Sequence, residues 1–200
     1  MPRCSKLLAI PAVAALLAAG QPLHAQQPAR APASDAAKAA RTEALKAFGQ
    51  RVKDYVVLKK RLQEGLPEMK TGDRSTGKVE RLEDTLAARI TRARAGARPG
   101  DIFGTAAPHF KAIIELDMRE RGMRDAFNSM EEVPRQSPLA VNAIYPEKAA
   151  LATVPPLLLV NLPRLPDGLE YRYMGRDLIL RDRDANLIVD FIDEAIPLER

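Results

Sequence analysis

The stretch Glu170–Ile192, EYRYMGRDLILRDRDANLIVDFI, decides the fold of the C-terminal part of this 200-residue chain. It holds three short runs rich in β-branched, aromatic and leucine residues. Gly175-Arg176 separates the first two runs and is typical of a two-residue hairpin turn. Residues 183–186 (RDAN) separate the second and third runs with residues that favour turns. The pattern predicts a three-stranded antiparallel meander, which we place at residues 169–193.

The two turns also predict a register. Closing both turns tightly gives these pairs: Tyr173 with Leu178, Tyr171 with Leu180, Leu180 with Val189 and Leu178 with Phe191. All of these side chains then share one apolar face. The opposite face is mixed and carries Arg172, Ile179, Arg181, Ile188, Asp190 and Ile192. An apolar face of this size needs a cover, which we expect from upstream helices or from a leucine-rich segment.

The residues before the meander predict helices. Apolar residues recur at three- and four-residue steps over 35–65 and 78–97, and again from Pro108 towards Pro134. We assign residues 35–133 to a helical region of antiparallel long helices. Residues 134–168 form a connecting segment with seven prolines and a short helix through Leu157–Val160. The predicted fold class is α+β, with the meander packed on the same domain.

The first 25 residues are typical of a secretory signal peptide. Arg3 and Lys6 precede an apolar run over 7–19 that is too short to span a membrane. Residues 26–34 then form a proline-dotted spacer that we expect to be disordered. The prediction is a soluble protein that is periplasmic or secreted. Cys4 is the only cysteine and would leave with the signal, so no disulfide is expected.

Charge and reactive side chains argue against several functions. Removal of the signal leaves 29 basic and 26 acidic side chains, a balance that does not indicate nucleic-acid binding. His109 would be the only remaining histidine, and no Gly-x-Ser-x-Gly motif is present. We therefore expect no enzyme and no cofactor. A carboxylate hydrolase using Glu115 and Asp117 is the weakest hypothesis, because residues two apart on a helix do not face each other.

Two sets of residues are candidates for binding. Four arginines, Arg89, Arg92, Arg94 and Arg98, follow one another with no acidic residue among them and form an arginine strip. The first set is a partner-binding set that joins part of this strip to the mixed sheet face: Arg89, Arg92, Arg172, Arg181 and Asp190. The alternative to partner binding for the strip is that its cations complement a helix C-terminus. The alternative for the sheet face is a solvated patch of ion pairs. The second is a metal set, Asp182, Asp184 and Asn186, whose spacing copies the start of a calcium loop. The alternative is that these residues only form a turn, because Asp and Asn side chains bond to nearby backbone groups there.

The meander also resembles a known module. Tyr171-Arg172-Tyr173, Gly175, Leu178-x-Leu180-x-Asp182 and Ile188-Val189-Asp190 resemble the β module that closes small periplasmic proteins of the nickel/cobalt-homeostasis type. Asn186 stands where that module usually has a glycine. The leading hypothesis is a non-catalytic envelope protein that binds a protein or cell-envelope partner or acts as a scaffold. The alternative, implied by the resemblance, is a periplasmic metal- or small-ligand-binding protein.

Overall fold

The computed structural model describes residues 31–67, 76–121, 139–146 and 154–197. The elements are α1 (Ala31–Gln63), α2 (Thr76–Ala93), the 3-10 turn η1 (Gly104–Ala106), α3 (Ala107–Arg121), α5 (Pro156–Asn161), β1 (Leu169–Met174), β2 (Asp177–Asp182) and β3 (Leu187–Ile192). The three strands form one antiparallel sheet in the order β1-β2-β3. The α+β class with a C-terminal meander is therefore confirmed.

The helix boundaries differ modestly from those predicted. α1 begins four residues early, because the alanine-rich segment from Ala31 favours helix and Pro32 is tolerated in a first turn. Gly65, with φ of 77°, follows the end of α1 as expected. α2 begins two residues early and ends at Ala93, after which the chain turns towards the sheet. The signal peptide, most of the spacer, Phe127, Met130 and Pro134 lie outside the described residues.

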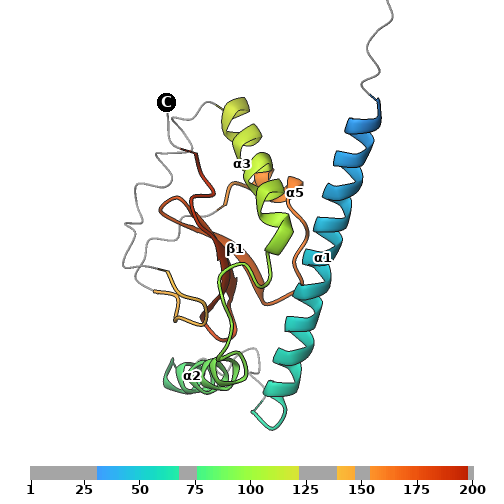
Figure 1. The fold of residues 1–200 in the computed structure, drawn as a ribbon. Coiled ribbons are helices and arrows are strands. Elements are labelled where there is room, and N and C mark those ends of the chain that lie inside the picture. The colour runs from blue at the N-terminus through green and yellow to red at the C-terminus, as the bar shows by residue number, and fades with distance from the viewer. Residues whose placement is uncertain (1–30, 68–75, 122–138, 147–153, 198–200) are drawn as a thin grey trace, which may run out of the picture.

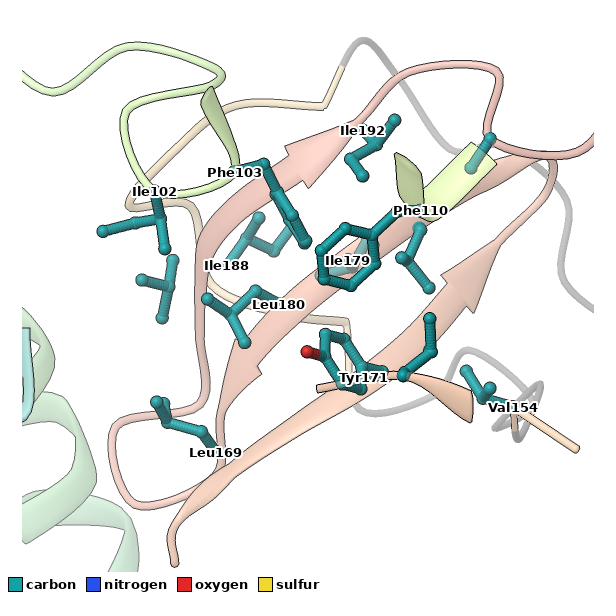
Figure 2. Close-up of a cluster of buried hydrophobic side chains, with 14 of the residues drawn as sticks. Ile102, Phe103, Phe110, Val154, Leu169, Tyr171, Ile179, Leu180, Ile188 and Ile192 are labelled. Carbon is teal, nitrogen blue, oxygen red and sulfur yellow. The ribbon is translucent and has the colours of Figure 1, made fainter. Parts of the chain in front are cut away.

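The helices lie beside the sheet and do not all run along one another. α1 and α3 run in opposite directions, and α2 lies across the C-terminal end of α1 (Figure 1). The aromatic rings of Phe48, Phe103 and Phe110 pack together, with centroids 5.0 to 5.4 Å apart. Phe110 also contacts Tyr171 of β1 at 5.8 Å. The helices therefore cover one face of the sheet, and Figure 2 shows Phe103 and Phe110 over its buried side chains.

The predicted register is right for the first hairpin and wrong for most of the second. Tyr173 pairs with Leu178 and Tyr171 with Leu180, as the tight turn requires. In the second hairpin, Leu180 pairs with Asp190 and Leu178 with Ile192, because the register shifts after the pair of Arg181 with Ile188. Val189 is the extra residue of a β-bulge, and a bulge changes the face of every residue beyond it. Asp190 and Ile192 therefore share the helix-facing side with Tyr171, and Phe191 lies opposite.

The two edges of the sheet differ. Residues 142–145 run along the outer edge of β3, where Asn142 N–H donates to Ile188 O and Tyr145 N–H donates to Asn186 O. The chain thus protects this edge, as sheet proteins commonly do. Among the described residues, β1 pairs only with β2, so its other side is the second edge of the sheet.

Candidate functional site

A groove follows the edge of β1 that no other described strand pairs with. It is lined by residues 169–172 of β1, by Leu159 of α5, by Val154 before that helix and by residues 163–165 after it. Neighbouring residues of a strand point to opposite faces, so a cavity that touches both Glu170 and Tyr171 runs along the strand edge. Its volume is about 400 Å³, which lies within the usual range of small-molecule sites.

The groove has apolar walls, and three charged residues also line it, Arg164, Glu170 and Arg172, which we call its mouth. Six apolar or aromatic residues form the walls: Val154, Leu159, Pro163, Leu165, Leu169 and Tyr171. The hydroxyl of Tyr171 donates to Pro163 O at 3.0 Å, which ties β1 to the segment after α5. Burial raises the pKa of this hydroxyl. It therefore stays a neutral donor, and the charge at the site comes from Glu170, Arg172 and the exposed Arg164.

Arg172 and Arg181 lie together on the sheet face away from the helices, as predicted, and both bind Glu170. Arg172 donates through Nε and Nη2 to the two Glu170 oxygens, each at 2.8 Å, and Arg181 Nη1 donates to Oε1 at 3.1 Å. Arg181 also lies over the Tyr145 ring, 4.4 Å from its centroid. The three charged side chains are only 15–18 % exposed, so this is a partly buried ion-pair cluster rather than a solvated patch.

The cluster gives a pH-dependent contribution to stability. Burial of Glu170 opposes its ionisation, but its bonds to Arg172 and Arg181 outweigh burial and lower the pKa of Glu170. A lowered folded-state pKa stabilises the fold above the unfolded pKa of about 4.3, and the benefit is lost as the pH falls through the folded value.

We expect Glu170→Gln to cost about 1 kcal/mol at pH 7. The difference from the unmodified protein should shrink as the pH falls below about 4. Urea unfolding across pH 3–7 measures this, with Glu64→Gln, an exposed site on the turn after α1, as the control. A Glu170→Gln difference that is constant over this range would contradict the assignment.

Asp190 does not join this cluster, and its predicted place on the mixed face is wrong. Its side chain is completely buried, and Oδ1 accepts from Gly100 N at 2.7 Å. Oδ2 accepts from Ile102 N and Phe103 N, each at 2.8 Å. The bulge at Val189 turns the carboxylate inward to hold the loop before η1. A side chain with no exposed surface cannot contact a partner.

The predicted metal residues Asp182 and Asp184 form an internal ion pair with a helix residue. Lys59 Nζ lies 2.7 Å from Asp182 Oδ1 and 2.7 Å from Asp184 Oδ2. Tyr55 donates its hydroxyl to Asp182 Oδ2 at 2.8 Å, and the backbone of Asp184 donates to Asp182 Oδ1 at 2.9 Å. The last of these hydrogen bonds, from a backbone N–H of the turn to an aspartate side chain, is the ordinary turn interaction named above as the alternative to metal binding. Among the described residues, no group of three or more His, Cys, Asp or Glu side chains is placed to hold a metal ion.

Asn186, the third predicted metal residue, has a structural task in the same turn. Its φ is 47°, a left-handed conformation that asparagine tolerates better than most residues. Its amide donates to Tyr145 O at 3.1 Å and accepts from Arg181 at 2.6 Å.

The predicted arginine strip does not form one surface. Arg89 donates to Leu62 O and Glu64 O at the end of α1, so it binds a helix C-terminus, although not that of its own helix. Arg94 points inward and donates to Val189 O at 3.0 Å. Arg92 and Arg98 are exposed. Partner binding by Arg89 or Arg92 stays a prediction.

The residues considered for catalysis lie apart from the groove. Glu115 pairs with Arg119 one turn along α3. Glu115 and Asp117 line a different cavity, between α1, α3 and α5, and His109 is not among its lining residues. The concave site that would gather His109 with these carboxylates is therefore not formed by the described residues.

Comparison with known proteins identified no relative. No protein-family model, curated protein or solved structure matches the chain. The resemblance of the meander to nickel/cobalt-homeostasis proteins therefore stays a prediction. In the part of the chain that the structure describes, no helix combines the length and apolar character needed to cross a bilayer.

Proposed function

We propose that the chain is a non-catalytic binding protein of the cell envelope and that its ligand lies in the groove between α5 and β1. One observation carries the proposal: an apolar-walled cavity of about 400 Å³ opens beside a helix that leaves large apolar side chains exposed. The envelope location rests on the predicted signal peptide and remains a prediction.

The exposed side of α5 supports binding at this place. Leu158 is buried, but Leu157, Leu159 and Val160 are 66 %, 40 % and 82 % exposed. Single exposed leucines are ordinary, whereas a cluster beside a cavity is typical of an interaction site. Full burial of one such side chain stabilises a complex by about 1.5–3 kcal/mol. A ligand that covers Leu159 would gain part of this energy.

A neutral fluorescent probe tests the groove. N-phenyl-1-naphthylamine brightens in apolar surroundings, and we expect it to bind the full chain. Leu159→Gln should weaken binding about threefold to tenfold, because it places an amide in the groove wall. Leu157→Gln is the matched control, since Leu157 lies on the same helix and does not line the groove. Equal binding by both variants, or no binding by the unmodified chain, would contradict the proposed function.

A further inference from the structure

We propose that the groove selects an anionic amphiphile, a single aliphatic chain whose carboxylate pairs with Arg164. The inference rests on the proposed function and adds the chemistry of the ligand. It follows from two properties of the site: the charge at the mouth and the character of the walls.

The mouth carries positive charge that the described residues do not balance. Glu170 accepts hydrogen bonds from both Arg172 and Arg181, so one carboxylate serves two guanidinium groups. Arg164 lines the groove and is exposed, and no described acidic side chain forms an ion pair with it. The three charged residues that line the groove therefore carry a net charge of +1, and Arg181, which does not line it, shares Glu170 with Arg172. Such a mouth attracts an anion and repels a cation.

The walls specify the rest of the ligand. Val154, Leu159 and Leu165 offer only hydrocarbon, and the one wall hydroxyl, that of Tyr171, is already bonded to Pro163 O. A polar body would lose its bonds to water in such a groove without replacement. A flexible alkyl chain has no hydrogen bonds to water to lose, and its charged head can stay at the solvated mouth.

Displacement of the neutral probe by three amphiphiles with ten-carbon chains tests this proposal. The amphiphiles are decanoate, decanol and decyltrimethylammonium, each below its micelle-forming concentration. We expect decanoate to displace the probe at the lowest concentration and the cation at the highest. The preference for decanoate should fall in high salt, because the mouth is exposed to solvent.

Three variants locate the carboxylate. Arg164→Gln should weaken displacement by decanoate about fivefold and leave decanol unchanged, as expected for one partly exposed ion pair. Arg183→Gln removes an exposed arginine on the turn between β2 and β3 and should change neither. Glu170→Gln should strengthen decanoate binding, because it frees the charge of Arg172 and Arg181.

Several outcomes would overturn the inference while the proposed function survives. One is equal displacement by decanoate and decanol. A second is an unchanged decanoate preference in Arg164→Gln. A third is displacement only by an amidated, extended apolar hexapeptide, which would instead indicate strand pairing along the edge of β1. Failure of the probe itself to bind would contradict the proposed function and the inference together.

Discussion

Replacing Asp190 with alanine should lower the free energy of unfolding by about 3–5 kcal/mol. Four backbone N–H groups donate to this buried carboxylate: those of Gly100, Ile102, Phe103 and Phe191. Alanine leaves these donors without their acceptor, and two of them, the N–H groups of Ile102 and Phe103, are buried. Each unsatisfied buried donor costs about 1–3 kcal/mol, although the loop can relax and recover part of the loss. Small domains are stable by about 5–15 kcal/mol, so a large fraction of the stability is at stake.

The loss of Asp190 should also disturb the hydrophobic core, because the loop that Asp190 holds contributes to it. Phe103 belongs to the aromatic cluster with Phe48 and Phe110, and its backbone N–H is one of the donors. Burial lowers the pKa of the nearby Arg94 guanidinium, and the negative charge of Asp190 opposes that shift. Loss of Asp190 therefore loosens the packing of Phe103 and removes an anion that favours charged Arg94.

Urea unfolding followed by circular dichroism measures the loss. Asp190→Asn should be nearly as harmful as alanine, because an amide nitrogen would face N–H donors. Asp167→Asn, at an exposed site before β1, should change the free energy of unfolding by less than about 0.5 kcal/mol. An Asp190→Ala protein as stable as the Asp167 variant would show that the carboxylate does not hold the loop.

Asp190 also shows which part of the fold could not be predicted from the sequence. The first hairpin was predictable in register because Gly175-Arg176 allows only a short connection. Both pairs predicted for the second hairpin are wrong, and only the pairs beside its turn, such as Arg181 with Ile188, keep the register that a tight turn over residues 183–186 gives. The bulge at Val189 does not disturb the alternation of apolar and polar residues along the strand, because Ile188, Val189 and Ile192 are all apolar and fit either register. A buried carboxylate inside that run was the remaining hint, because a charge in an apolar strand needs donors nearby.

Lys59 is a stronger signal in the sequence, and it points to a buried ion pair. It interrupts the apolar stripe of the first predicted helix, one turn after Tyr55. A lysine on the buried face of a helix requires an acidic partner. Asp182 ends the second predicted strand and Asp184 lies in the turn that follows it, so both were candidates for that partner. The groove had no comparable signal. Its walls come from α5, from the segment after it and from β1, and only the folded chain brings Leu159 and Arg164 to the edge of β1.

Lys59→Met is the second substitution with a large expected effect, about 3–5 kcal/mol of lost stability. Lys59 is 5 % exposed and Asp182 is completely buried. Removing the ammonium leaves the Asp182 carboxylate inside the protein with only neutral donors, the hydroxyl of Tyr55 and backbone N–H groups. The site is also tightly fitted around the pair. Gly168 has φ of 84°, and a Cβ there would lie 2.9 Å from Lys59 Nζ. Methionine fills the space of the lysine stem, so the loss reports charge rather than volume.

A double variant separates the ion pair from the fold around it. Asp182→Asn should restore at least half of the stability that Lys59→Met removes, because the amide needs no counter-charge and can donate to Tyr55. The resulting coupling between the two sites should be at least about 2 kcal/mol in urea unfolding. Lys53→Met, at an exposed position of α1, is the matched control and should have little effect. If Lys59→Met matched Lys53→Met, α1 would not depend on this ion pair for its place against the turn between β2 and β3. Additive losses in the double variant would instead mean that each residue acts through its own packing, since a buried charge pair must couple its two members.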